Sequence, residues 1–172
     1  PASATLVSSL DTPGFALDLA VTDNNAYVAA RRAGLRVIDI STIGSPLETD
    51  VSGGGNFPIL SVDILEDDFI ATFYPRGFIA PVGGGTAPRT KRLPPQQFGI
   101  WQRIAARNGY AYIAAESGGL RIFDISPIHD THEVGFFAKQ GPEDAFDVTL
   151  ANAIAFVADR TVSDGDELYL RV

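Results

Sequence analysis

Residues 34–41 read GLRVIDIS, and residues 119–126 read GLRIFDIS. A phrase of this length does not recur so closely by chance, so the chain contains an internal repeat. A second, looser phrase recurs four times at a spacing of about 42 residues: YVAA at 27–30, FIAT at 69–72, YIAA at 112–115 and FVAD at 156–159. The chain therefore consists of four similar units, with a spacing typical of repeat architectures.

Each unit carries signals for short β-strands. Runs such as LDLAV (17–21), AYVAA (26–30) and LRVIDI (35–40) are rich in β-branched and aromatic residues, and turn residues separate them. No window shows a sustained helical period. Three or four strands in every repeat predict an all-β propeller, in which each unit is one blade that buries its faces against its neighbours.

The two ends of the sequence leave two arrangements open. The last unit ends at ELYLRV (167–172), which corresponds to a third strand, while ATLVSSL (4–10) lies where the fourth strand of a preceding unit is expected. Either residues 4–10 complete the last blade and close a four-bladed ring, or the chain is a consecutive part of a larger ring. In both cases we expect one domain over residues 1–172, with blades at 13–52, 57–97, 98–138 and 143–172.

The composition excludes several classes of function. The chain of 172 residues has no cysteine, so it has no disulfide, thiolate metal site or cysteine nucleophile. Its net charge of −8 argues against nucleic acid and anionic membranes as partners, because both require clustered Lys and Arg. No apolar run approaches the ~18 residues of a membrane-spanning helix, so we expect no membrane insertion.

Two long segments resemble a known family. The pattern PGFALDLAVTDNNAYVAARRAGLRVIDIS (13–41) is similar to the LVIVD repeat of bacterial and archaeal surface-associated proteins, and FGIWQRIAARNGYAYIAAESGGLRIFDIS (98–126) resembles a second copy. The likeness is partial in the fourth unit and poor over 73–97, where GFIAPVGGG (77–85) replaces the GLR phrase. The resemblance implies a β-propeller without established catalytic activity and an extracellular, periplasmic or cell-surface location.

The repeated phrase itself is expected to be structural. Gly34 and Gly119 are predicted to lie in tight turns with positive φ. The apolar residues of the phrase fill the space between blades. Asp39 and Asp124 are each followed by a serine two residues later, a pattern that predicts side-chain bonds to the backbone of the next turn.

Charged residues in the first strand of each unit are the first candidate site. Asp18, Asp63 and Asp147 are predicted to occupy matching places in units one, two and four, with Arg103 in unit three. If these strands line the central axis, the carboxylates converge, and Arg103 or a bound Ca²⁺ or Mg²⁺ relieves their repulsion. Alternatively, the carboxylates accept bonds from backbone amides of neighbouring blades and Arg103 pairs with one of them, so that no cofactor is needed.

A second candidate is the segment IHDTHEVG at 128–135. It places His129 and His132 next to acidic residues, a composition that can bind a transition metal. A solvated turn explains the same composition without a metal.

The third candidate is the segment 75–97, which is rich in Pro and Gly. It carries four basic residues in an acidic chain, and a long loop of this kind on a rigid scaffold can contact an acidic partner or a neighbouring subunit. Alternatively, it is a mobile or packing loop without a partner. Trp101, just after the segment, is expected in the core, whereas an exposed Trp101 would mark an interface. The basic residues are Arg76, Arg89, Lys91 and Arg92.

These features support three functional hypotheses. The first is a non-catalytic binding or assembly module that presents its loops, above all 75–97, to a protein partner or a neighbouring subunit. The second is a metal-dependent hydrolase or lactonase-like enzyme with its site at the channel mouth. The third is that the chain is a fragment or subunit of a larger propeller assembly, to which the function belongs.

Overall fold

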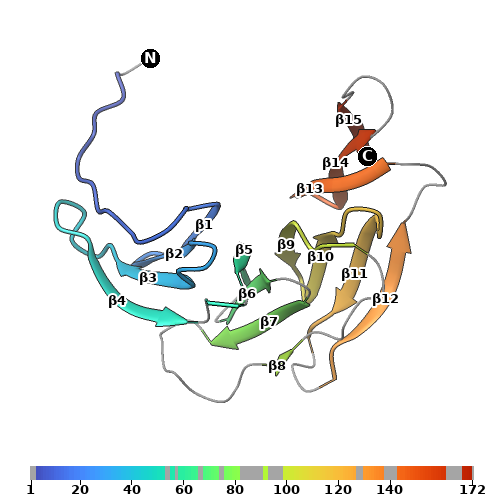
Figure 1. Cartoon of the computed structure of the whole chain (residues 1–172), viewed down its shortest axis with the longest axis horizontal. Helices are drawn as coiled ribbons and strands as arrows, with labels where there is room; N and C mark the ends of the chain where they lie inside the picture. The colour runs from blue at the N-terminus through green and yellow to red at the C-terminus, as the bar shows by residue number, and fades with distance from the viewer. Residues whose placement is uncertain are drawn as a thin grey trace.

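The computed structural model confirms the all-β class. It describes residues 3–52, 55–56, 58–65, 68–73, 76–81, 91–92, 99–126, 130–137, 143–161 and 168–171. These residues form four separate antiparallel sheets and no helix (Figure 1). Accordingly, no helix among them is long and apolar enough to cross a membrane. We call each sheet a blade.

The blades follow one another in chain order. Blade 1 consists of β1 (Asp18–Val21), β2 (Asn25–Ala29), β3 (Leu35–Asp39) and β4 (Leu47–Ser52). Blade 2 consists of β5 (Ile59–Leu65), β6 (Asp68–Phe73), β7 (Arg76–Pro81) and β8 (Lys91–Arg92). Blade 3 consists of β9 (Arg103–Arg107), β10 (Tyr110–Ala114), β11 (Leu120–Asp124) and β12 (His132–Phe137). Blade 4 consists of β13 (Glu143–Ala151), β14 (Ile154–Thr161) and β15 (Leu168–Arg171).

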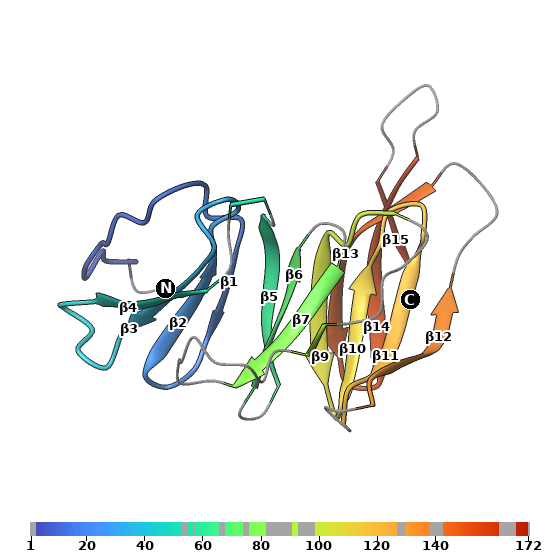
Figure 2. The same ribbon diagram turned by 60° about the horizontal axis from the view of Figure 1, so that its bottom comes forward.

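Within each blade, every strand pairs with the next strand of the sequence. The first strand of each blade lies innermost and contacts the first strand of the following blade, so that β1, β5, β9 and β13 form a continuous inner row. Figure 2 shows the sheets standing side by side along this row. The result is an open arc with blade 1 at one end and blade 4 at the other (Figure 1).

A closed four-bladed ring is not confirmed. Residues 3–10 form no strand, and they lie beside blade 1, across the arc from β15 (Figure 1). The hydroxyl of Ser8 donates to the Ile43 carbonyl at 2.6 Å, a bond that ties this segment to its own blade. Among the described residues, blade 4 therefore has three strands where each other blade has four.

The core lies between the blades. One cluster joins Tyr27, Ala29 and Leu35 of blade 1 to Val62 and Ala71 of blade 2. A similar cluster joins blades 3 and 4. We call the side of a blade that faces the following blade its front face, and the opposite side its rear face. Because an inner blade is covered on both sides, its strands are apolar at nearly every position, as the sequence indicates.

The turn predictions for the repeated phrase are confirmed. Gly34 and Gly119 have φ values of +91° and +69°. The Ser41 amide donates to Asp39 Oδ1 at 2.8 Å, and the Ser126 amide donates to Asp124 Oδ1 at 3.0 Å. Hydrogen bonds from these serines lower the pKa of Asp39 and the pKa of Asp124.

Candidate functional site

Three of the four predicted inner-strand residues share one register, and the fourth does not. Asp63 lies two residues beyond this position in β5, where it pairs with Ile70 of β6. Ser61 takes the shared position in blade 2. The equivalent cross-strand pairs are Asp18 with Ala29, Ser61 with Thr72, Arg103 with Ala114 and Asp147 with Ala158.

Asp18 connects blade 1 to blade 2. Its Oδ1 accepts the N–H of Leu19 at 2.9 Å, within its own blade. Its Oδ2 accepts the hydroxyl of Ser61 and the N–H of Val62 at 3.1 Å, both from blade 2. Ser61 repeats the relation one blade further, since its hydroxyl oxygen accepts the N–H of Ile104 in blade 3 at 3.2 Å. In blades 1 and 2 the residue at the shared position therefore accepts a backbone N–H of the following blade.

Asp63 makes a separate connection from blade 2 to blade 3. Its Oδ1 accepts the N–H of Ile64 at 2.8 Å, and its Oδ2 accepts the N–H of Ala106 at 2.7 Å. Burial raises the pKa of Asp63, the two amide bonds oppose the rise, and the nearby charge of Asp18 adds a smaller upward contribution. Both carboxylates that lie between packed blades thus bind backbone amides, as the simpler of our two hypotheses requires.

Arg103 binds backbone carbonyls and not a carboxylate. Its guanidinium donates to the carbonyls of Leu60 and Gln102 at 3.2 Å each, and to the carbonyl of Leu17 in blade 1 at 3.2 Å. Arg103 therefore connects blade 3 to both earlier blades at the inner row. Among the residues that the structure describes, its predicted pairing with a carboxylate is not found, and the guanidinium binds these carbonyls instead. The described residues contain no group of three metal-binding side chains.

Asp147 has the register of Asp18 but not its neighbours. Its Oδ1 accepts the N–H of Val148 at 2.8 Å, which repeats the bond from Leu19 to Asp18. Among the described residues, its Oδ2 accepts no hydrogen bond, and the residue is exposed on the front face of blade 4. This face has no following blade, so the bond that Asp18 makes forward has no counterpart at Asp147.

The remaining sequence candidates are not brought together. Trp101 is fully buried, with its ring 5.4 Å from that of Phe123, so it belongs to the core and offers no surface to a partner. His132 is exposed, and its Nδ1 lies 2.8 Å from the Asp130 carbonyl oxygen. His129 and Arg89 lie outside the described residues. Arg76 lies in β7, and Lys91 and Arg92 form β8.

Two equivalent ion pairs lie within blades 1 and 3 and were not predicted from the sequence. Arg36 and Glu48 are 3.3 Å apart, and Arg121 and Glu133 are 3.0 Å apart. Each arginine comes from the GLR phrase, is buried, and bridges the third strand of its blade to the fourth. The signal was present, because a glutamate follows the arginine by the same interval in both units.

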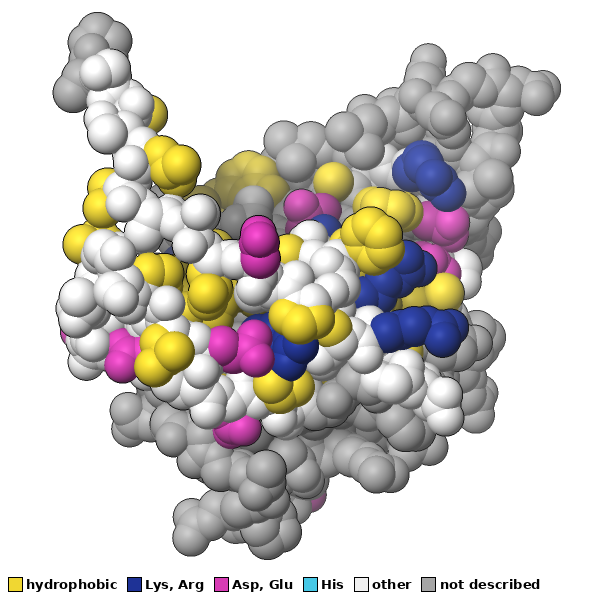
Figure 3. Space-filling model, turned by 60° about the vertical axis from the view of Figure 1, so that its left-hand side comes forward, with side chains coloured by type: hydrophobic (Ala, Val, Ile, Leu, Met, Phe, Trp, Pro, Cys, Tyr) yellow, Lys and Arg dark blue, Asp and Glu magenta, His cyan; other side chains and the backbone are white. Residues whose placement is uncertain are grey.

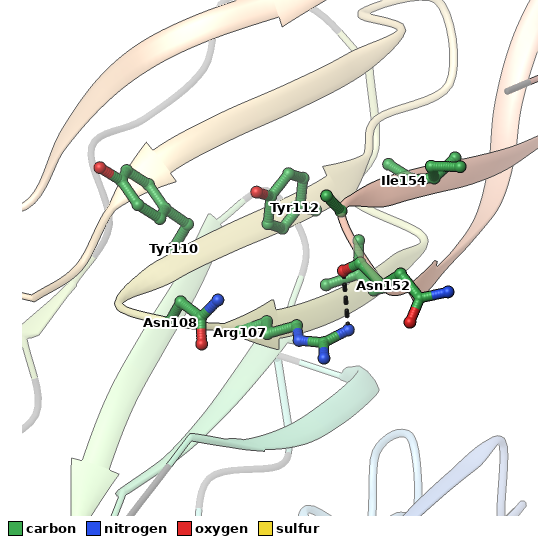
Figure 4. Close-up of a pocket in the computed structure, with 9 residues that line it drawn as sticks. Arg107, Asn108, Tyr110, Tyr112, Asn152 and Ile154 are labelled. Atoms are coloured by element: carbon green, nitrogen blue, oxygen red, sulfur yellow. Dashed lines mark hydrogen bonds between the residues drawn. The ribbon is translucent and has the colours of Figure 1, made fainter.

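A pocket of about 310 Å³ lies between blades 3 and 4, away from all predicted site residues (Figure 4). Tyr110 and Tyr112 line it from β10, and Asn152 and Ile154 line it from β13–β14. Arg107 donates to the Asn152 carbonyl at 2.9 Å, a bond that joins the two walls. The volume of the pocket is at the lower end of the range for small-molecule sites, ~300–1,000 Å³.

The similarity of this chain to solved structures shows its fold alone. The computationally designed protein Ika4 has 13% sequence identity and a TM-score of 0.67, with 97% of this chain and 98% of that chain covered. The designed protein Ika8 has 12% identity and a TM-score of 0.64, with 89% and 48% covered. YCF48 bound to D1 peptide has 16% identity and a TM-score of 0.54, with 92% and 56% covered. The chain thus spans about half of the last two.

The comparison with family models explains the repeated phrase. None of the curated protein sequences matches this chain. The model of the LVIVD repeat, a repeat associated with β-propeller folds, matches residues 13–51 and 99–129. These ranges cover the strands of blade 1 and the first three strands of blade 3, with the GLR phrase in each. Two segments of the chain, one in blade 1 and one in blade 3, therefore match the LVIVD repeat model.

Proposed function

We propose that this chain is a non-catalytic, exported propeller module that binds another protein through the front face of blade 4. The observation that carries the proposal is the Asp147 carboxylate, whose Oδ1 is held as in Asp18 while its Oδ2 has no bond among the described residues. At the packed interface, the equivalent Oδ2 of Asp18 accepts a backbone N–H of the next sheet. Blade 4 thus presents a preformed acceptor for a further β-sheet.

The apolar residues around Asp147 follow the pattern of a packed face. Phe156 and Ala158 occupy the positions that Tyr27 and Ala29 occupy in blade 1. Tyr27 and Ala29 are fully buried against blade 2, whereas Phe156 and Ala158 are only partly buried. Aromatic surface next to a free acceptor is typical of the centre of a protein interface.

Two further observations agree with a binding role. YCF48, a structural neighbour, is recorded with a bound peptide, which gives a precedent for peptide binding on a chain of similar fold. The LVIVD repeats agree with the surface location that we expect. The basic segment 75–97 remains a second predicted contact region, most of it outside the described residues.

A photo-activated cross-linker at position 149 tests the proposal. Thr149 is exposed on the front face of blade 4, opposite Phe156. In cells that produce the protein, we expect one defined protein adduct, identified by mass spectrometry, which is lost when Asp147→Ala is added. The control carries the cross-linker at Val134, which is exposed on β12. Absence of an adduct at 149, or the same adduct from both positions, would contradict the proposal.

A further inference from the structure

We infer that the protein bound by blade 4 is a second copy of this chain, arranged head to tail, with the rear face of its blade 1 on the front face of blade 4. This inference rests on the proposed function, because it names the partner of the same face. It is carried by the state of the other end of the arc, blade 1.

On the rear face of blade 1 the inner strand β1 is exposed, whereas Ala26, Val28 and Ile38 further out on the same face are buried. Leu19 is 57% exposed and Val21 is 55% exposed. Leu19 lies opposite Val28, just as Ile104 lies opposite Ile113 in blade 3. Ile104, which the preceding blade 2 covers, is 6% exposed. Blade 1 therefore presents the inner part of a rear face that has no covering blade.

Figure 3 brings this end of the molecule forward. Hydrophobic side chains are exposed along the N-terminal segment and over the neighbouring blade 1. Several apolar patches at one end of the molecule are consistent with an interaction surface there. The front face of blade 4 and the rear face of blade 1 thus correspond to the two sides of the interface that joins neighbouring blades inside the chain.

Charge decides which ends meet. A front-to-front contact between two copies brings two Asp147 carboxylates together, and like charges in a desolvated interface repel. A front-to-rear contact follows the arrangement of Asp18 and Val62, and places the Asp147 carboxylate beside the Leu19 backbone of the second copy. It also covers the exposed Leu19 and Val21.

The N-terminal segment fits the same arrangement. In blade 1 the outer strand β4 comes shortly before the inner strand β5 of the next blade. Residues 4–10 come before β1 at a similar interval, so in a head-to-tail contact they reach the outer side of the partner's blade 4, next to β15. Leu6 is 82% exposed and Val7 is 63% exposed, and the segment pairs with no strand of its own chain among the described residues. It therefore supplies a fourth strand to blade 4 of the other copy, a move that releases the bond from Ser8 to the Ile43 carbonyl of its own blade.

The structural matches differ in how far they extend beyond this chain. The chain covers 48% of Ika8 and 56% of YCF48, but 98% of Ika4. Ika8 and YCF48 thus contain about as much chain again, and a second copy adds the same number of blades. Head-to-tail contacts of this kind give a closed ring when the rotation between copies closes.

The mass of the purified chain in solution tests the inference, with two variants that each disable one end. Leu19→Asp places a charge on the rear face of blade 1, and Thr149→Arg places a large cation on the front face of blade 4. Both residues are exposed, so we expect both variants to fold. The wild type is expected at twice its chain mass of 18.3 kDa, and each variant alone at 18.3 kDa.

Mixing the variants identifies the direction of the contact. The Leu19→Asp chain keeps a working front face, and the Thr149→Arg chain keeps a working rear face, so an equimolar mixture recovers the dimer. Val134→Asp, a charge on the exposed edge of blade 3, is the control and leaves the dimer intact.

Three outcomes overturn the inference. They are a monomeric wild type, dimers of Leu19→Asp alone, and no recovery in the mixture. If the wild type is monomeric while the cross-linker at position 149 still captures a different protein, the proposed function stands and only the identity of the partner is wrong. If neither experiment finds a contact, both proposals fail.

Discussion

Asp18 and Asp147 occupy the same register but have different neighbours, and this difference predicts different mutational costs. Asp18→Ala removes the acceptor for Ser61 and Val62, both of which are buried, so we expect a loss of about 1–3 kcal/mol in the free energy of unfolding. Asp147→Ala removes one local bond at an exposed position and should change the free energy by less than about 0.5 kcal/mol. Urea unfolding under monomeric conditions measures both; equal losses would contradict the comparison.

Asp63 predicts a pH dependence. Burial raises its pKa above the ordinary value of 3.8, so the folded protein holds this proton to higher pH than the unfolded chain does. The contribution of Asp63 to stability is therefore complete below pH 3.8 and is lost as the pH rises through the folded-state pKa. Relative to Asp63→Asn, which does not titrate, the wild type should become less stable across this window and then level off. Urea unfolding of both proteins over this pH range tests the sign of the stability change. A difference in the free energy of unfolding that stays constant with pH refutes the prediction.

Gly99 lies at a position where the backbone conformation is restrictive. Its φ is +72°, and a Cβ at this position would clash with the Ala115 carbonyl oxygen. Gly14 has the equivalent place in blade 1, with a φ of +87° and the Ala30 carbonyl oxygen 2.7 Å away. We expect Gly99→Ala to lower the free energy of unfolding by more than about 2 kcal/mol, since strain and a backbone clash combine. Gly44→Ala, at a position with open space, is the control for thermal unfolding.

At the scale of the element, the ion pair between the third and fourth strands makes the repeated phrase more than an apolar packing unit. Glu133→Ala leaves the buried Arg121 guanidinium without its carboxylate and should cost about 1–3 kcal/mol. Arg121→Met removes the charge together with its desolvation cost, so it should cost less, although the contact of Arg121 with the Phe136 ring is also lost. Chemical denaturation of the two variants ranks them, and a larger loss in Arg121→Met would show that the ring contact dominates.

The strands were predictable because the apolar residues that pack neighbouring blades together repeat as one pattern in the sequence. The register of blade 2 was not, because the shared position in β5 holds Ser61, which pairs with Thr72, and Asp63 follows two residues later. Alignment of the phrases matched one aspartate to another and so placed Asp63 with Asp18, whereas the strand pairing places Ser61 there. The ion pairs were predictable in principle, since Arg36 with Glu48 and Arg121 with Glu133 recur at one spacing.

At the scale of the whole molecule, the sequence repeats report similar blades but not the rotation between them. That rotation depends on inner-row contacts such as the reach of Arg103 to the Leu17 carbonyl, which joins residues 86 positions apart. A side chain with such a long reach has no local signal. The open arc, and with it the exposed rear face at Leu19, therefore emerges only from the structure.

The open arc predicts an uneven distribution of local stability that depends on concentration. In dilute protein, the amides of β13 and β14 border a face with no following blade, so they should exchange with deuterium faster than those of β9 and β10, which lie between two blades. If a second copy covers the ends, raising the protein concentration should slow exchange in β13 and β14 and in β1 and β2 together, because binding to the folded state stabilises the elements it covers. The outer strand β12 takes no part in that contact and serves as the internal control. Hydrogen exchange followed by mass spectrometry separates these segments, and protection that rises equally in all of them, or in none, would count against the head-to-tail contact.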